Sequence, residues 1–366
     1  MDDIVFVTAD SVRADYVEEM GLVSSFDVQR GMTAAQYTRP SLASIHASSY
    51  ESVLTGRVNG PTLAGALSNA GYTCLGLSPN PNTDATFGFA EGFDRYDSFI
   101  EPGNRGSGLR QYLANFDLLR RIYYKFYPPH AKSENRPRDR EVVEQAIEWF
   151  NAAEGPRFLW VHLMETHRPY GAGDDAVSEE LDQKAFFKPG KLTDAEKTEI
   201  EGKYRQSLDR ADENIRRLLA GIDSDDPTFV FTADHGEGFG DEGYYFHQPQ
   251  LRRVDDCLVE VPVVFDGIDV EGPCSLLDLT PTIAASAGAE VADRWDGNDL
   301  HSTATDYTIT IAPWHDEATV LWQDFERRLV SRDADVTFEY RGDETEVEDD
   351  VPEELQGQLR DLGYVE

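Results

Sequence analysis

The sequence lacks most of the features that mark a disulfide-bonded, secreted or membrane-spanning protein. It has 3 cysteines in 366 residues, an odd number without C-x-x-C spacing, which argues against a disulfide framework or a thiolate zinc site. Its longest apolar runs, such as 158–164 and 261–265, are far shorter than the roughly 18 residues that cross a bilayer. The first residues show no signal-peptide pattern. We therefore expect a soluble, cytoplasmic protein without membrane insertion.

Basic residues are also scarce. The 33 Lys and Arg face 69 Asp and Glu, which gives a formal net charge of −36. Such a surface repels nucleic acid and anionic membranes, so we expect neither as a partner. The acid is spread along the chain and few of the basic residues are lysine, a composition typical of proteins adapted to molar salt, which screens self-repulsion. We interpret the charge as an adaptation to a halophilic solvent.

Strands and helices are predicted to alternate through residue 287. Apolar, β-branched runs predict strands over 4–8, 72–77, 157–164, 228–232 and 262–265. Helical spacing predicts helices over 41–48, 61–70, 141–150, 195–220 and 276–287. This alternation predicts an α/β fold with a mostly parallel central sheet covered by helices on both faces.

After about residue 300 the pattern changes. Short strands are predicted over 307–312, 328–330 and 336–340, followed by a final helix over 352–362. We therefore predict a catalytic α/β domain over residues 1–300 and a small antiparallel sheet with a helix over 301–366.

Polar residues follow three of the predicted strands: Asp10, His167 and the Asp234-His235 pair. In open parallel sheets, ligands bind beyond the carboxyl ends of the strands. A carboxylate and a neutral imidazole are ordinary ligands of divalent metals, although a helix cap would explain the Asp-His pair equally well when it is taken alone.

Taken in chain order, these pieces resemble the sulfatase family of the alkaline-phosphatase superfamily. The resemblance is carried by VTADSVRAD (7–15), YTRPSLAS (37–44), FLWVHLMETHRPY (158–170) and FTADHGEGFGDEG (231–243). It continues through 261–264, 278–282 and the ending at 359–365, so it covers nearly the whole chain. It implies the fold of that family, with the small C-terminal unit described above.

The resemblance also implies a metal site and a nucleophile. Asp10, Asp234 and His235 would bind one divalent cation, and Thr38 would attack with its oxygen coordinated to the same ion. Two carboxylates, one imidazole and an alkoxide suit Mn²⁺ or Zn²⁺, whereas Ca²⁺ is the usual ion of the sulfatase branch. One metal is expected because no Asp-x-x-x-His motif completes a second ligand set.

Further roles follow from the same resemblance. His167 and His247 would hold the substrate oxyanion or protonate the leaving group, although an aromatic-packed, structural His247 is an equal alternative. Arg39 would bind the anionic ester together with His167, because a guanidinium matches the fork of a phosphate or sulfate. Arg13 is interpreted as an ion-pair residue and His162 as a packed core histidine.

The nucleophile block departs from that of sulfatases proper, which carry Cys-x-Pro-x-Arg or a Ser version and convert that residue to formylglycine. Here the block reads TRPSL (38–42), so no formylglycine is expected. Threonine at this position resembles the phosphodiesterase, phosphonate-hydrolase and phosphoethanolamine-transferase branches, which form a phosphothreonine intermediate. We therefore expect a metal-dependent hydrolase of phosphate mono- or diesters, acting on a small-molecule or glycan ester.

Three alternatives stay open. The chain could be a sulfate-ester hydrolase, although a threonine sulfate would hydrolyse slowly. It could transfer a phosphoryl or phospho-alcohol group to a glycan or lipid. Least favoured is a degenerate, non-catalytic binding module. Substrate choice is expected to depend on the loops at 99–136 and 171–197, from which no pocket can be derived, and the sequence indicates no oligomeric state.

Overall fold

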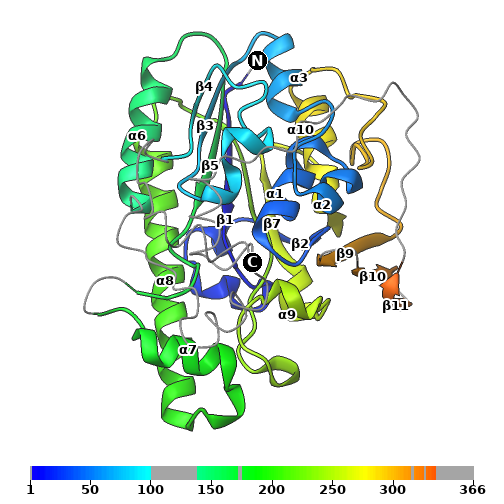
Figure 1. The fold of residues 1–366 in the computed structure, drawn as a ribbon. Coiled ribbons are helices and arrows are strands. Elements are labelled where there is room, and N and C mark those ends of the chain that lie inside the picture. The colour runs from blue at the N-terminus through cyan, green and yellow to red at the C-terminus, as the bar shows by residue number, and fades with distance from the viewer. Residues whose placement is uncertain (1, 100–137, 172–174, 315–316, 325–326, 335–366) are drawn as a thin grey trace, which may run out of the picture.

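A computed structural model describes residues 2–99, 138–171, 175–314, 317–324 and 327–334 (Figure 1). Eight strands form the main sheet. In spatial order they are β4 (Arg95–Asp97), β3 (Thr73–Leu77), β5 (Arg157–Leu163), β1 (Ile4–Ala9), β6 (Thr228–Ala233), β7 (Glu260–Asp266), β2 (Val28–Met32) and β8 (Cys274–Ser275).

The sheet is mostly parallel, as the sequence predicts. Strand β1 pairs in parallel with β5 on one side and with β6 on the other. Strand β7 runs antiparallel to both β6 and β2. Strand β2 was not expected from the sequence, because its residues VQRGM form neither an apolar run nor a strict alternation. Its first two residues are only partly buried, and Arg30 is exposed.

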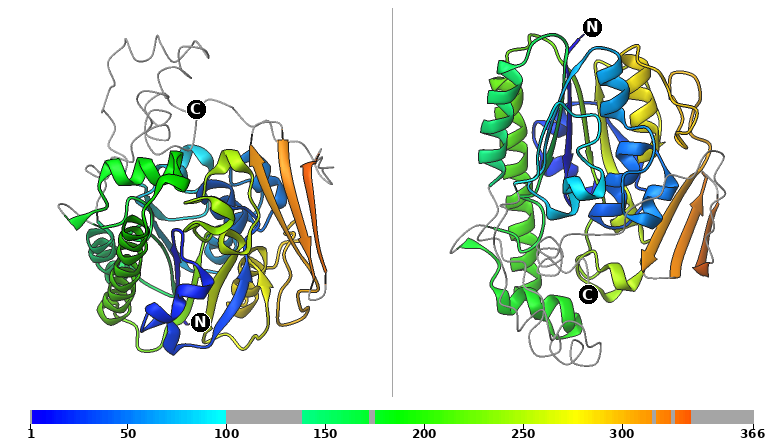
Figure 2. Two further views of the ribbon diagram at one scale, coloured as in Figure 1. Left: turned by 90° about the horizontal axis from the view of Figure 1, so that it is seen from below. Right: turned by 45° about the horizontal axis from the view of Figure 1, so that its top comes forward.

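Helices cover both faces of this sheet (Figures 1 and 2). One face carries α6 (Asp139–Ala152) and α8 (Asp194–Gly221), and the other carries α1 (Thr38–Ala47), α3 (Leu63–Asn69) and α10 (Leu279–Ser286). The shorter helices are α2 (Tyr50–Thr55), α7 (Glu179–Phe187) and α9 (Asp256–Val259). Within the described residues, no helix is both long enough and apolar enough to cross a membrane.

Local signals explain where the helices begin. A capping box between Thr193 and Glu196 starts α8, at the position that the apolar periodicity predicts within a residue. Helix α1 begins earlier than expected, at Thr38, because Pro40 lies within its first turn, where a missing N–H costs little. The nucleophile candidate is therefore the first residue of a helix and not part of a preceding loop.

The centre of the sheet is fully buried. All six residues of β1 and six of the seven residues of β5 are buried, and the largest side chains of this core include Phe6, Phe158 and Trp160. A continuous apolar strand between two helical layers is the expected pattern for a parallel sheet. The core thus fixes the carboxyl ends of β1, β5 and β6 in one rigid edge.

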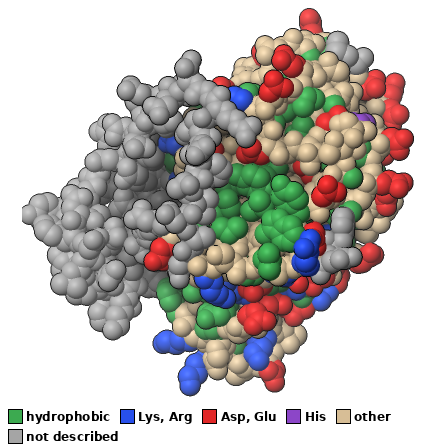
Figure 3. Space-filling view, turned by 90° about the vertical axis from the view of Figure 1, so that its right-hand side faces the viewer, with side chains coloured by type: hydrophobic (Ala, Val, Ile, Leu, Met, Phe, Trp, Pro, Cys, Tyr) green, Lys and Arg blue, Asp and Glu red, His purple; other side chains and the backbone are tan. Residues whose placement is uncertain are grey.

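A second, antiparallel sheet lies beside the main one. Its strands are β9 (Thr308–Trp314), β10 (Glu317–Gln323) and β11 (Arg328–Ala334), in the order β11-β10-β9. It joins the body through β9, where the Ile311 N–H donates to the Ala34 carbonyl at 2.8 Å. Figure 3 shows hydrophobic side chains gathered on this side of the molecule, among acidic groups. The predicted strand at 336–340 and the predicted helix at 352–362 lie outside the described residues.

Candidate active site and metal centre

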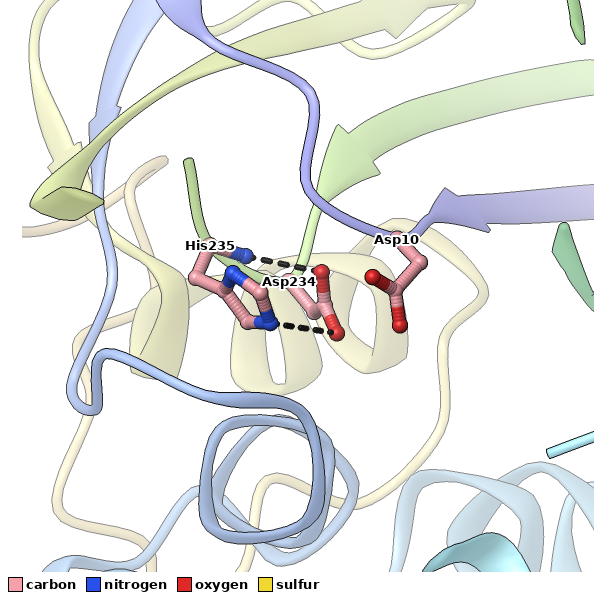
Figure 4. A group of neighbouring side chains, drawn as sticks. All are labelled: Asp10, Asp234 and His235. Atoms are coloured by element: carbon pink, nitrogen blue, oxygen red, sulfur yellow. Dashed lines mark hydrogen bonds and ion pairs between the residues drawn. The ribbon is translucent and has the colours of Figure 1, made fainter. Parts of the chain in front are cut away.

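The strand register brings the first three site residues together. Ala9 pairs with Ala233 across the β1–β6 interface, so Asp10 and Asp234 follow two neighbouring strands at the same level. With His235 they form a buried group in which one ligand atom of each residue lies within 4.8 Å of the others (Figure 4). The arrangement is one that a single metal ion can occupy, as the sequence predicts.

The two carboxylates are adjacent and fully buried. Asp234 Oδ1 accepts the backbone N–H groups of Ser11 at 3.0 Å and His235 at 2.9 Å, whereas its buried Oδ2 has no hydrogen-bond partner. Burial and the charge of Asp10 raise the pKa of Asp234 to about 8. A cation between the carboxylates would neutralise both and occupy the unpartnered oxygen, so these residues fit a divalent metal.

The Asp10 carboxylate faces several imidazoles. Burial opposes its ionisation, but the neighbouring His167, His162 and His235 outweigh burial and hold the pKa of Asp10 well below its usual value. Its Oδ1 accepts the Ser11 hydroxyl at 2.6 Å. Asp10 is therefore the carboxylate that stays ionised, which suits a metal ligand.

His235 is oriented by its own turn. Its Nδ1 lies 2.8 Å from the Gly236 carbonyl, which can only accept, so Nδ1 carries the proton. The unprotonated Nε2 then faces the site, 3.5 Å from Asp234 Oδ2 and 3.3 Å from Thr38 Oγ1. A backbone carbonyl that fixes the tautomer in this way is the usual companion of a metal-binding histidine.

Thr38 lies at the N-terminus of α1 and completes the group. Its hydroxyl donates to Asp10 Oδ2 at 3.1 Å. The helix is tied to the loop after β6 because the Ser41 hydroxyl donates to the Asp234 carbonyl at 2.6 Å. The positive end of the α1 dipole at this point favours an anionic oxygen or an anionic ester.

The two further predicted histidines lie next to this group. The His247 ring lies 4.4 Å from that of His235 and 5.5 Å from that of His167, measured between ring centroids. His247 Nδ1 donates to the buried Glu237 carboxylate at 3.1 Å, and the Tyr170 hydroxyl donates to the other Glu237 oxygen at 2.7 Å. The structure thus places His167 and His247 beside the predicted metal ligands, and Glu237 orients His247.

Two residues of this site were not singled out from the sequence. Ser11 adopts a left-handed backbone, with φ at 59°, which turns the chain at the end of β1 and aims its N–H at Asp234. Glu237 is fully buried and hydrogen-bonded to His247. The position of Glu237 within the Asp-His-Gly-Glu block was a signal for a site role, whereas a left-handed serine has no sequence signal of its own.

The predicted anion-binding arginine lies on α1, one residue after Thr38. The Arg39 guanidinium lies over the Phe87 ring at 4.6 Å, and Arg57 lies over the same ring at 5.8 Å. Arg39 Nε is buried without a hydrogen-bond partner, and no ion pair to a described carboxylate forms at either arginine. Burial lowers the pKa of Arg39, and the nearby charge of Arg57 lowers it further.

The structural roles expected for Arg13 and His162 have different outcomes. Arg13 forms ion pairs with Asp15 and Asp241 at 2.8 Å each, which confirms it as an ion-pair residue. His162 is buried in the core as expected, but its Nε2 also lies 3.7 Å from Asp10 Oδ2. It is therefore part of the surroundings of the predicted metal ligands.

This fold and site define a sulfatase-type member of the alkaline-phosphatase superfamily. The sulfatase family model matches residues 2–289, so the chain belongs to the sulfatase family.

Individual relatives are more distant. The low-salt glycan biosynthesis sulfotransferase Agl7 of Haloferax volcanii is 27% identical over 167 residues, 42% of this chain and 38% of that protein. The phosphonate monoester hydrolase SpPMH of Silicibacter pomeroyi superposes with a TM-score of 0.64 at 18% identity, covering 92% of this chain and 88% of its own. The 2-O glycosaminoglycan sulfatase BT1596 gives 0.63 at 14% identity, covering 90% and 82%.

Proposed function

We propose that the protein is a metal-dependent hydrolase of phosphate mono- or diesters that acts through a covalent intermediate on Thr38. The observation that carries the proposal is the position of the Thr38 hydroxyl, 3.1 Å from Asp10 Oδ2 and 3.3 Å from His235 Nε2. A hydroxyl this close to two predicted metal ligands is placed to be activated as a nucleophile by the same ion. The absence of a convertible Cys or Ser at this position supports phosphorus over sulfur chemistry.

The proposed reaction has two displacement steps. Thr38 Oγ1 forms a bond to phosphorus as the ester oxygen leaves, and water then attacks phosphorus and releases Thr38. A bound Mn²⁺ or Zn²⁺ would lower the pKa of the hydroxyl and neutralise the anionic ester oxygens. Asp10, Asp234 and His235 would hold that ion.

Two imidazoles are available for the leaving group. His167 and His247 border the site, and their ring centroids lie 5.5 Å apart. We propose that one protonates the leaving oxygen while the other donates a hydrogen bond to the phosphoryl oxygens. The contact with Glu237 suits His247 to the first task, because the hydrogen bond from Nδ1 fixes the ring and leaves Nε2 for the leaving oxygen.

Arg39 and Arg57 support an anionic substrate. Two guanidinium groups that share the Phe87 ring without a carboxylate partner among the described residues are unusual in a protein of net charge −36. A phosphate or a second acidic group of a glycan would neutralise them. We propose Arg39 as a substrate-binding residue on this ground.

A transferase is the second candidate, and one observation favours it. The Haloferax relative is a sulfotransferase of glycan biosynthesis, although this chain matches only 38% of its length. In that reading a glycan hydroxyl, and not water, would accept the group from Thr38, and the first step would be unchanged. Sulfate esters remain substrates to be tested because the family is named for them.

A parallel assay distinguishes these chemistries. The purified protein in molar KCl with Mn²⁺ would be given 4-nitrophenyl phosphate, bis(4-nitrophenyl) phosphate, 4-nitrophenyl phenylphosphonate and 4-nitrophenyl sulfate. Dominant cleavage of a phosphorus ester supports the proposal, whereas dominant sulfate cleavage overturns it. A rise in 4-nitrophenol release on addition of a glycan or alcohol acceptor, with a capped product, would indicate transfer.

The decisive variant is Thr38→Ala. We expect turnover to fall about a thousandfold or more, because the nucleophile is removed, while the melting temperature stays close to that of the wild type. Thr38→Ser should retain part of the activity, since it keeps a hydroxyl at the same place. Thr55→Ala, which alters an exposed threonine of α2, is the matched control. Full activity in Thr38→Ala would show that another group attacks.

A further inference from the structure

A chain of buried polar side chains runs from the core of the sheet to the metal-ligand group. The Trp160 indole N–H donates to Thr8 Oγ1 at 3.1 Å, and Thr8 Oγ1 lies 2.9 Å from His162 Nδ1. On the far side of that ring, His162 Nε2 lies 3.7 Å from Asp10 Oδ2. All four side chains are completely buried. The register pairs Thr8 with His162 across β1 and β5, so the contacts follow from the sheet itself.

The direction of the hydrogen bonds in this chain can be deduced. A hydroxyl has one hydrogen to donate, and Thr8 Oγ1 already accepts from Trp160. Among the described residues, His162 Nδ1 is the acceptor available to the buried Thr8 hydroxyl hydrogen. Thr8 therefore donates to Nδ1, and the neutral ring carries its proton on Nε2, on the side of Asp10. Any other assignment leaves a buried hydroxyl hydrogen without an acceptor.

We infer that His162 is a positioning residue for the metal ligand Asp10. Its Nε2–H faces Oδ2, the oxygen that also accepts the Thr38 hydroxyl, while Ser11 holds Oδ1 at 2.6 Å. The carboxylate thus has a hydrogen-bonded hydroxyl on Oδ1 and a buried N–H facing Oδ2, at a distance of 3.7 Å, before a metal arrives. This inference rests on the proposed function, because it assumes that Asp10 binds the ion.

The same geometry decides against a ligand role for His162 itself. A metal-bound Nε2 would have to be unprotonated, which would force the proton onto Nδ1 and leave the Thr8 hydroxyl without an acceptor. The group of residues whose ligand atoms come within 4.8 Å of each other contains Asp10, Asp234 and His235 and does not include His162. His162 therefore acts on the metal through Asp10.

The experiment measures metal affinity and needs no substrate. Metal-stripped protein in molar KCl is titrated with Mn²⁺ by calorimetry. Replacing His162 by Leu should weaken binding about tenfold or more, the usual effect of losing a partner of a metal ligand. His162→Gln should restore most of the affinity, because its amide nitrogen lies near the position of Nε2 and can donate to Asp10. His46→Leu is the matched control, since His46 is buried against the same Trp160 and does not contact Asp10.

A second variant tests the chain without touching His162. Thr8→Val has nearly the same shape and removes the donor that fixes the tautomer, so we expect a several-fold loss of Mn²⁺ affinity. In a protein that already carries His162→Gln, Thr8→Val should alter the dissociation constant for Mn²⁺ by about twofold or less. Glutamine has no ring tautomers, so Thr8 has no tautomer to select.

The possible results distinguish a failure of the proposed function from a failure of the positioning role of His162. If the wild type binds neither Mn²⁺ nor Zn²⁺, the proposed function fails. If the wild type binds Mn²⁺ while Thr8→Val and a folded His162→Leu bind it equally well, the positioning role is overturned. Equal losses in His162→Leu and His46→Leu would also overturn it, because they would indicate a general effect on the core.

Discussion

At the scale of single residues, the site depends on two carboxylates that differ although they lie side by side. Asp10 is surrounded by imidazoles and keeps its charge, whereas Asp234 is buried next to that charge and is protonated more easily. Neighbouring acids whose pKa values are driven apart are a common feature of functional sites. A proton on Asp234 would neutralise part of the charge that a cation bound between the two carboxylates would otherwise neutralise.

This pair predicts a pH dependence of metal binding. The pKa of Asp234 is raised from its usual 3.8 to about 8, so the folded, metal-free protein binds one more proton than the unfolded chain across that range and loses stability as the pH rises through it. A divalent cation must displace the same proton. We therefore expect the rise in melting temperature caused by Mn²⁺ to be larger at pH 8.5 than at pH 6.

Asp234→Asn is the control for that measurement. It removes the titrating group and one ligand charge, so both the stabilisation by Mn²⁺ and its dependence on pH should become small. A wild-type stabilisation that is the same at both pH values would contradict the assignment of the proton to this pair.

At the scale of elements, the loop after β6 is shaped by a close approach of two backbones. The N–H groups of Gly236 and Glu237 donate to the carbonyls of Leu258 and Cys257 at 2.8 and 2.9 Å. A Cβ atom built on Gly236 would lie 2.0 Å from the Cys257 carbonyl oxygen. Only glycine fits at this point, and the loop that carries His235 packs directly against α9 as a result.

Gly236→Ala should therefore damage both the fold and the site. We expect a loss of about 2 kcal/mol or more in the free energy of unfolding and a weaker Mn²⁺ affinity, because the loop must move away from Cys257. Gly202→Ala is the matched control. Its Cβ would meet nothing within 4 Å on α8, so it should stabilise by roughly 0.5–1 kcal/mol. Chemical denaturation of both variants tests the pair, and equal stability of Gly236→Ala and wild type would refute the packing argument.

Elements with a continuous apolar pattern could be predicted from the sequence, and elements whose stability comes from their neighbours could not. The runs at 4–8 and 228–232 gave β1 and β6 within a residue, and the amphipathic spacing gave α8. Strands β2 and β10 were missed because each is half-exposed and is held mainly by strand pairing. Strand β2 pairs with the sequence-distant β7, and β10 pairs with its chain neighbours β9 and β11.

The same division applies to the site. The order of the motifs pointed to Asp10, Thr38, Asp234 and His235, and the structure places these four together. The tautomers and the contacts of Ser11 and His162 depend on register across strands, which no single-sequence pattern specifies.

At the scale of the whole molecule, the net charge of −36 is the dominant feature. Acidic side chains are spread over the face shown in Figure 3, and many arginines of the described residues are already engaged in ion pairs. The remaining repulsion among carboxylates is only weakly screened in dilute buffer. At 1 M salt the Debye length is about 3 Å, so carboxylates farther apart than this scarcely repel each other.

Stability should therefore depend on salt. We expect the melting temperature to rise by several degrees between 0.1 M and 2 M KCl, and activity to follow it. Glycine betaine at equal osmolality is the control, because it is excluded from the surface but does not screen charge. A melting temperature that is independent of KCl would contradict the halophilic interpretation.

The position of β1 at the centre of the sheet has a consequence for how the protein is made. Thr8 and His162 are 154 residues apart in the sequence, and Ser11 and Asp234 are 223 apart. At roughly 5–20 residues per second, a ribosome needs on the order of ten seconds to supply β5 after β1, and longer to supply β6. During that time an apolar strand has no partner on either side, and closing such distant pairs is slow. Asp10 and the Asp234-His235 pair can meet only after this wait, so an ion bound between them could not serve as the nucleus around which the first half of the chain folds.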